Sequence, residues 1–323
     1  MTNTRQYAIG STYLLATAII WGLQFPVAKG AFEIVDAFHS SVFRFGVPAL
    51  IMVILLWMFE GRKGFTLNRQ SSEIAGLGVL GMCATPSLIF GGLMLTRPEI
   101  AAVIVATQPI ISVLVQRLWH KEKPDLLSTL CVLVAFIGVI TVVTHWDTSL
   151  NMSRKELIGD LMIFTGAICW VIYSIACGKY PNWSNLRLTA WTLTTGTVGN
   201  LLLVVTLVTA GWLAVPSASD WFEVRFELIF LAFIGVLVAM YSWNSGSRMI
   251  GAINAMLFVN LIPVVTFAVR HLQGHRIELI ELLGASLVIA ALLIQNFALR
   301  RKMQRMEPEL PQNLKQKLAV KNA

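Results

Sequence analysis

Charge is scarce in this chain. Only 13% of its 323 residues are charged, 56% are hydrophobic, and the mean hydropathy is +0.70. Roughly a quarter of the residues in a soluble domain are charged, so the composition excludes an ordinary soluble domain and fits a chain surrounded by lipid. Because one membrane-spanning helix takes about 20 apolar residues, ten such helices would use about 200 residues and leave only short connections.

The sequence also lacks the motifs of common soluble enzymes. It contains no His-Glu-x-x-His, no Gly-x-x-x-x-Gly-Lys-Ser/Thr and no Gly-x-Ser-x-Gly. We therefore predict no catalytic residue, metal site or cofactor, and no ATP-driven transport by this chain alone. Disulfides are not expected either, because all four cysteines lie in hydrophobic stretches rather than in polar loops: Cys83, Cys131, Cys169 and Cys177.

Carboxylates are missing from the middle of every hydrophobic stretch. All 17 acidic residues lie in loops, in the tail or within a turn or so of the end of a stretch. Ionisable groups inside a membrane usually mark function because they are costly there, so a proton relay through a deeply placed Asp or Glu has no support. Exchange, facilitated diffusion or coupling through Asp160, Glu99 or Glu33 stays open, against the simpler reading of those three as solvated surface charge.

What the sequence has in abundance is long apolar runs, and these predict an all-α integral membrane protein of ten transmembrane helices. The approximate ranges are 8–28, 38–59, 74–95, 98–117, 126–145, 157–178, 188–212, 226–246, 250–270 and 279–299.

Basic residues gather after the last apolar run. Seven of the 25 lie there, namely Arg300, Arg301, Lys302, Arg305, Lys315, Lys317 and Lys321. Because Lys and Arg mark the cytoplasmic side of a membrane protein, we expect both termini to be cytoplasmic and the protein to lie in the cytoplasmic membrane. The net charge of +8 then reflects contact with membrane lipids rather than with nucleic acid.

The two halves of the chain resemble each other at a steady spacing. Ala18-Ile19-Ile20-Trp21 corresponds to Ala167-Ile168-Cys169-Trp170 at an offset of 149, while Gly81 and Pro109 correspond to Gly235 and Pro263 at 154. Small drifts in offset are what loop insertions between two copies produce. The predicted units are 1–150, 151–299 and a basic cytoplasmic tail, 300–323. Since each unit holds five spans, the second enters the membrane from the opposite face, as in the inverted repeats of secondary transporters.

Short motifs occur in both halves, namely Trp21-Gly22, Phe25-Pro26, Phe43-Arg44-Phe45, Gln108-Pro109, Lys121-Glu122, Trp243-Asn244-Ser245-Gly246, Ile250-Gly251-Ala252, Ala255, Asn260-Leu261-Ile262-Pro263-Val264 and Gly284. Over residues 8–299 they resemble the EamA-type proteins of the drug/metabolite transporter superfamily. The resemblance implies ten helices and export of metabolites, amino acids or drugs across a bacterial inner membrane. The family's usual Gly-Glu pair is replaced in both halves, and the first helix lacks the glutamate of the smaller multidrug-resistance relatives, which argues against proton-coupled export of cations.

Two prolines lie near the middle of the fourth and ninth predicted helices. Pro109 and Pro263 each remove a backbone donor and free a carbonyl that lipid cannot satisfy, and the amides of Gln108 and Asn260 are close by. These positions are either hinges beside a substrate site or simple kinks packed against neighbouring helices.

Aromatic and amide side chains share helix faces at a spacing of three residues. Such faces suit a cavity for an amphipathic substrate, although tryptophan near a helix end is also an ordinary interfacial anchor. The candidate lining residues are Trp21, Gln24 and Phe25, then Trp170 and Tyr173, then Tyr241, Trp243 and Asn244.

One basic residue, Arg44, falls about two turns inside a predicted span. It either holds a substrate carboxylate, pairs with Asp36 or Glu33, or extends to the lipid headgroups. His39, at the mouth of that span, is expected to be an ordinary interfacial residue.

Three functions remain in competition. The first is a secondary transporter, most simply an exporter of small amphipathic metabolites or amino acids. The second is a membrane enzyme acting on a lipid-linked substrate, for which Glu33, Asp36, His39 and Arg44 form the one plausible group. The third is a receptor or assembly factor that transports nothing. Substrate, direction and coupling ion stay open, as does assembly into a homodimer.

Overall fold

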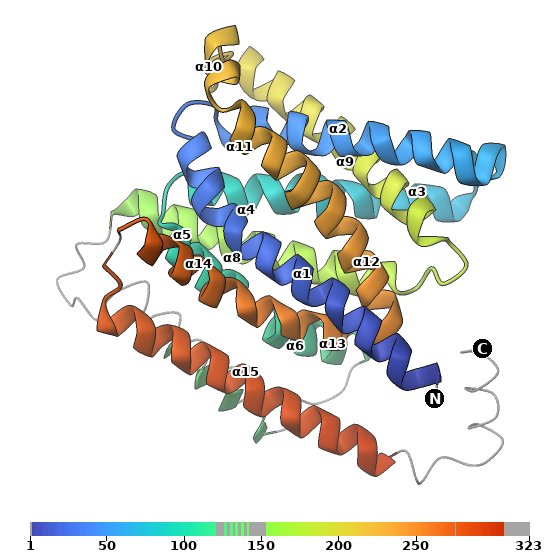
Figure 1. The fold of residues 1–323 in the computed structure, drawn as a ribbon, viewed down its shortest axis with the longest axis vertical. Coiled ribbons are helices and arrows are strands. Elements are labelled where there is room, and N and C mark those ends of the chain that lie inside the picture. The colour runs from blue at the N-terminus through green and yellow to red at the C-terminus, as the bar shows by residue number, and fades with distance from the viewer. Residues whose placement is uncertain are drawn as a thin grey trace.

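Helices form all the regular secondary structure that the computed structural model describes, which comprises residues 2–120, 153–274 and 276–306 with scattered positions between 126 and 141 (Figure 1). Within these ranges eight helices are long and apolar enough to cross a membrane, and a shorter apolar helix covers Leu279–Ala291. The chain is therefore a multi-pass membrane protein. The predicted span 126–145 and residues 307–323 of the tail lie largely or wholly outside the described residues, so the count of ten helices stays a prediction.

The eight long helices correspond to predicted spans, including the two closely spaced pairs. Their bounds are Ala8–Ala31, Ala37–Phe65, Arg69–Leu93, Pro98–Val115, Arg154–Cys177, Asn185–Thr209, Arg225–Ile250 and Asn254–Leu272. Divided at irregular turns, the helices are α1 (Thr2–Ala31), α2 (Ala37–Glu60), α3 (Arg69–Gly78), α4 (Thr85–Leu93), α5 (Pro98–Val105), α6 (Gln108–His120), α8 (Arg154–Cys177), α9 (Asn185–Thr209), α10 (Ala218–Glu223), α11 (Arg225–Ile229), α12 (Ala239–Ile250), α13 (Ala252–Met256), α14 (Leu261–Leu272) and α15 (Leu279–Met306).

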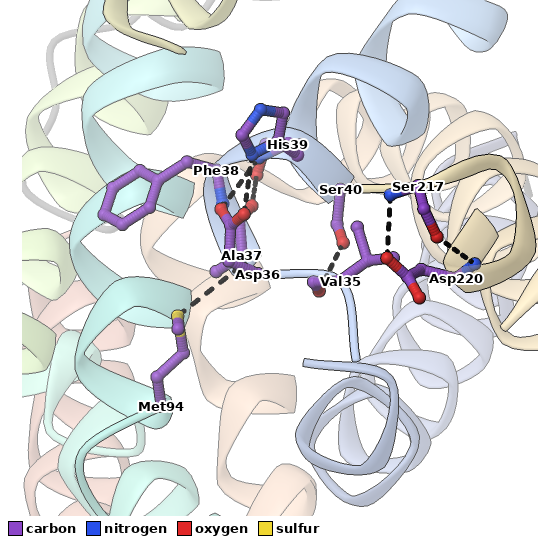
Figure 2. Close-up of polar contacts among 10 residues, drawn as sticks. Val35, Asp36, Ala37, Phe38, His39, Ser40, Met94, Ser217 and Asp220 are labelled. Atoms are coloured by element: carbon purple, nitrogen blue, oxygen red, sulfur yellow. Dashed lines mark hydrogen bonds and ion pairs between the residues drawn. The ribbon is translucent and has the colours of Figure 1, made fainter. Parts of the chain in front are cut away.

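Side-chain caps set where several helices begin. Asn68 and Ser71 cap each other's backbone, so α3 starts at Arg69, about a turn before the apolar run. Asp36 accepts hydrogen bonds from the backbone of Phe38 and His39 at the start of α2 (Figure 2). The membrane-spanning helices are thus longer than their apolar cores.

Two π-helical segments interrupt the third and eighth predicted spans. Val79–Ala84 joins α3 to α4, and Phe230–Val238 joins α11 to α12. At the offset of 154 seen in the sequence, the first segment corresponds to residues 233–238 of the second. Single π-helical turns inside helices occur frequently at functional sites, and these two segments contribute residues to the cavity described below.

The predicted kinks at the two prolines are breaks in the helices. α5 ends at Val105 and α6 begins at Gln108, so Pro109 is the second residue of a new helix. On the other side a 3₁₀ segment, Leu257–Asn260, leads into α14, in which Pro263 is the third residue. Early helix positions suit proline because their N–H groups lack an intrahelical acceptor.

Glycines allow two pairs of helices to touch. A Cβ on Gly246 of α12 would lie 2.8 Å from the carbonyl oxygen of Gly10 in α1, and one on Gly92 of α4 would lie 2.4 Å from that of Gly159 in α8. Such contacts are typical of helix packing in membranes. The two contacts are related by the sequence offsets, since Gly10 corresponds to Gly159 at 149 and Gly92 to Gly246 at 154. Figure 1 shows α1 running through the bundle beside α12 and α14, with α15 along one edge.

Candidate functional site

A cavity lies at the middle of the bundle, where the long helices meet. Its free space is about 90 Å³, which is small beside the roughly 300–1,000 Å³ of typical ligand pockets, so a substrate larger than a small solute needs side chains to move. It is lined by Trp21, Gln24, Phe25, Arg44, Phe45, Gly81, Met82, Thr85, Pro86, Ile89, Phe90, Val105, Gln108, Trp170, Gly235, Val236, Met240 and Ile262.

Six of the eleven residues proposed from the sequence as substrate contacts lie in this lining. They come from the first, second, fourth and sixth predicted spans, which are far apart in the sequence, and they are Trp21, Gln24, Phe25, Arg44, Gln108 and Trp170. Their role in binding stays a prediction, but the structure brings them to one place.

Two further candidates extend the aromatic wall behind the cavity. The Trp21 ring lies 5.2 Å from that of Trp170 and 5.1 Å from that of Trp243, and Trp170 lies 5.2 Å from Tyr173, all measured between ring centroids. These separations are within the range of favourable aromatic pairs. Trp243 and Tyr173 are buried and pack against the lining tryptophans rather than lining the cavity themselves.

The remaining candidates lie elsewhere. Tyr241 is 40% exposed and faces away from the cavity. Asn244 is buried and donates to the Thr189 hydroxyl at 2.9 Å. Asn260 is buried beside the break before α14, where neither amide atom has a hydrogen-bond partner among the described residues. The three-residue spacing on α12 therefore did not identify residues of the cavity lining, since neither Tyr241 nor Asn244 belongs to it.

Arg44 is the single charged residue in the described lining. Only 1% of it is exposed, its Nη2 donates to Gln24 Oε1 at 2.9 Å, and its guanidinium carbon lies 4.1 Å from the centre of the Phe90 ring. It forms no ion pair with the described parts of the chain, including Asp36 and Glu33, and it does not extend to the headgroups. Of the three readings of this residue, the structure does not match the ion pair or the headgroup contact, and the binding of a substrate carboxylate stays a prediction.

Gln24 links this arginine to the second half of the chain. Its amide nitrogen donates to the carbonyl oxygen of Gly235 at 3.2 Å, and a Cβ on Gly235 would lie 2.9 Å from the Gln24 side chain. Gly81, which corresponds to Gly235 in the repeat, also faces a large side chain at close range: a Cβ on Gly81 would lie 2.4 Å from the Tyr173 ring. Glycine is needed at both π-helical segments for these side chains to fit.

The lining also contains residues that sequence reasoning missed, and the repeat offset from the predicted Gln108 is a signal that could have found one of them, Ile262. Ile262 follows Gln108 by 154 residues, and both line the cavity. Met240 follows Pro86, and Val236 follows Met82, by the same number. Phe45 and Phe90 carry no such signal.

Charged residues close one end of the bundle, the predicted outer end. Arg270 Nε lies 2.7 Å from Glu99 Oε1, and Arg97 Nη1 lies 2.9 Å from Glu281 Oε1; both glutamates are fully buried. Lys29 Nζ donates to the carbonyl oxygens at the end of α4 and just beyond, those of Leu93, Met94 and Thr96. The sequence placed these carboxylates near helix ends without indicating their burial.

Next to these ion pairs lies a polar hollow with free space of about 500 Å³. Pro26 and Lys29 of α1 line it, whereas Phe25 lines the central cavity, so less than one helical turn separates the two spaces. Of the three interfacial acids, Glu33 is exposed, as the surface-charge reading expects, whereas Glu99 and Asp160 are buried. A role of either residue in coupling transport stays a prediction.

The opposite end is held by hydrogen bonds between the segments around residues 60–73 and 180–187. Tyr180 Oη donates to Glu73 Oε2 at 2.7 Å, and Trp183 Nε1 donates to Gln70 Oε1 at 3.1 Å. Partial burial and the neighbouring Glu73 carboxylate raise the pKa of Tyr180 to about 12, so this phenol stays neutral at physiological pH.

The polar group proposed for an enzyme at the outer face is dispersed. His39 Nδ1 lies 2.6 Å from Asp36 Oδ2, and the other Asp36 oxygen caps α2 (Figure 2). Arg44, two turns further along, turns into the cavity instead, and Glu33 is exposed. The Asp36–His39 pair thus has a structural role at the helix start and no second acid or base in the group beside it.

Comparison with known proteins identifies the family. The sequence model of the EamA-like transporter family matches residues 8–144 and again 157–297. The chain belongs to this family. The resemblance seen in the motifs is therefore confirmed, and the family model matches once in each half.

Curated relatives match this chain over most of its length and most of their own. The uncharacterized transporter YrdR of Bacillus subtilis strain 168 is 30% identical over 92% of this chain and 94% of its own length. The uncharacterized transporter YyaM of the same organism is 31% identical over 89% of this chain and 93% of its own. One solved crystal structure shares the fold with a TM-score of 0.64 at 16% identity, covering 92% of this chain and 98% of that one.

Proposed function

We propose that this protein is a secondary transporter that exports small amphipathic metabolites or amino acids across the bacterial inner membrane by alternating access. The observation that carries the proposal is the cavity itself, which lies between helices of both halves and beside two helix breaks and two π-helical segments. Broken helices around a central site are typical of secondary transporters. No enzyme chemistry or cofactor is needed for this function.

The proposed architecture is ten helices in two inverted repeats with both termini in the cytoplasm. Support comes from the paired glycine contacts, Gly10 with Gly246 and Gly159 with Gly92, which recur at the offsets found in the sequence. The meeting of Trp21 with its counterpart Trp170 is what a pseudo-twofold axis between the halves would produce. The two matches to the family model add an independent argument.

Alternating access needs contacts that break at one end while those at the other end hold. At the predicted outer end the buried ion pairs Arg270–Glu99 and Arg97–Glu281 join the halves, and we assign them the role of the outer gate. At the predicted cytoplasmic end the bonds from Tyr180 and Trp183 to Glu73 and Gln70 have the corresponding role.

Transport by the purified protein in liposomes tests the proposal. Vesicles loaded with each member of a panel of unlabelled amino acids and amphipathic metabolites should accumulate the same labelled compound by counterflow for at least one member. Protein-free vesicles give the background. If no compound moves above that background under any imposed ion or pH gradient, the protein is not a transporter of this class.

Three substitutions separate transport from chemistry at the outer face. The transporter predicts that Gln108→Ala and Asn260→Ala impair activity and that His39→Ala is nearly silent. An enzyme built on the outer polar group predicts the reverse. A receptor that transports nothing would bind ligand without exchanging it between the two sides.

A further inference from the structure

The buried polar groups that face the cavity without a partner are all hydrogen-bond donors. Nε and Nη1 of Arg44, and Nε1 of Trp170, have no acceptor among the described residues, and these residues are 1% and 6% exposed. A guanidinium has five N–H donors and no acceptor. A buried donor that lacks a hydrogen-bond acceptor costs free energy. A ligand that satisfies this cavity must therefore bring acceptors.

The electrostatics select a negative ligand. Arg44 is the single charged group in the described lining, and no carboxylate among the described lining residues offsets it. Its contacts with Gln24 and the Phe90 ring orient the guanidinium plane without neutralising it. Planar guanidinium groups bind carboxylates through two parallel hydrogen bonds from neighbouring nitrogens. Gln24 accepts from one N–H of Arg44 Nη2, so the other N–H of Nη2 can act together with the unused nitrogen beside it, Nε or Nη1.

The rest of the lining describes the other end of the ligand. The first half contributes the polar side chains Gln24, Arg44, Thr85 and Gln108, whereas the second half contributes the apolar Val236, Met240 and Ile262 beside the single N–H of Trp170. The free space of about 90 Å³ suits a short apolar group better than a ring. A matching ligand therefore has a polar end, which faces the first half, and an apolar end, which faces the second half.

We infer that the substrate is a small organic carboxylate with a short apolar group, its carboxylate held by Arg44 and its apolar end against the second half of the chain. The inference rests on the proposed transport function for its physiological meaning and narrows the substrate to carboxylate-bearing compounds. The same carboxylate occurs in simple acids and in zwitterionic amino acids. The described lining offers no anion to the ammonium group of the latter, so the simple acid is favoured.

Binding can be measured apart from transport, by calorimetric titration of the purified protein with three compounds of similar shape: 3-methylbutanoate, valine and 3-methylbutanamide. Both carboxylates should bind roughly 10- to 100-fold more tightly than the neutral amide, the range expected for hydrogen bonds to a charged group. The simple acid should bind more tightly than valine. Tighter binding of valine would overturn the preference for a simple acid, and equal binding of acid and amide would overturn the inference.

Arginine variants locate the effect. Arg44→Gln should reduce the affinity for 3-methylbutanoate to that for the amide, and Arg44→Lys should leave an intermediate affinity because it keeps the charge but not the planar fork. Arg62→Gln makes the same chemical change at an exposed position and should have no effect. If Arg44→Gln does not fold, as judged by thermal unfolding, the ranking of ligands on the native chain and on Arg44→Lys still decides.

Two outcomes separate this inference from the proposed function. If the protein transports panel compounds but binds the acid and the amide equally well, the inference of a carboxylate substrate is wrong and the proposed transport function still holds. A chain that binds carboxylates through Arg44 but exchanges none across the membrane contradicts transport and leaves the site intact. If chloride displaces 3-methylbutanoate at equal concentration, the site binds anions in general, and the inference of a carboxylate-specific site is wrong.

Discussion

The halves of the chain before and after residue 150 build the same cavity with different chemistry. Both contribute a tryptophan, Trp21 and Trp170, and both contribute a glycine at a π-helical segment, Gly81 and Gly235. At other matched positions they diverge, most clearly where Gln108 faces the cavity from one half and Ile262 from the other. The shared positions are those where helices pack closely, and the divergent ones are free to be specialised for a ligand. Architecture is therefore common to the halves, while the groups that we infer to recognise the ligand lie mainly in the first.

The largest expected effect concerns the ion pairs that join the halves. Glu99→Gln leaves the Arg270 guanidinium without its carboxylate, and breaking a buried pair costs about 3–5 kcal/mol. Breaking the exposed pair Arg69–Glu73 from its other side, with Arg69→Gln, leaves the Tyr180 bond to Glu73 in place and should cost about 0–1 kcal/mol. Thermal unfolding of the purified variants measures both. Equal effects would mean that the halves are held together elsewhere.

The second prediction tests whether the two π-helical glycines are equivalent. Gly81→Ala places a Cβ 2.4 Å from the rigid, buried Tyr173 ring, whereas Gly235→Ala meets the Gln24 side chain at 2.9 Å. Overpacking costs about 1–3 kcal/mol, and Gly81→Ala should lie at the upper end because a ring adapts less than an amide chain. Unfolding midpoints in denaturant compare the two. A greater loss from Gly235→Ala would reverse the account of these contacts.

The helices were predictable from the sequence because about 20 apolar residues leave an unmistakable pattern. The repeat and the paired prolines were readable as well, and most of the aromatic face around Trp21 followed from helical spacing. The direction of the Arg44 side chain could not be predicted, because a basic residue two turns inside a span can extend to the lipid headgroups, form an ion pair or point into a cavity. Nor was the burial of Glu99, Asp160 and Glu281, because burial there depends on which helices meet at the bundle end.

A smaller effect should separate the matched lining positions. Gln108→Ile removes an amide that the first half of the chain contributes to the cavity. It should lower the rate of counterflow roughly tenfold, the effect of one hydrogen bond of about 1.4 kcal/mol. Ile262→Leu conserves volume and polarity and should change the rate less than about threefold. A larger effect of the change at Ile262 would place recognition in the second half instead.

The smallest expected effect concerns the helix breaks. Pro109→Ala and Pro263→Ala restore a backbone donor at positions that still lie early in α6 and α14, so folding should be little affected. If the breaks are hinges, each variant should slow counterflow a few-fold without changing ligand affinity. Unchanged rates in both variants would indicate simple packing kinks.

The central claim is that the cavity is reached from both sides of the membrane in turn. Thr85 lines it, and a Thr85→Cys variant can be made in a chain whose four cysteines are replaced by alanine. We predict that a membrane-impermeant maleimide labels this cysteine in right-side-out and in inside-out vesicles, with Arg62→Cys as the control that reacts from the cytoplasmic side alone. Labelling of Thr85→Cys from one side only, with the control behaving as expected, would contradict alternating access through this cavity.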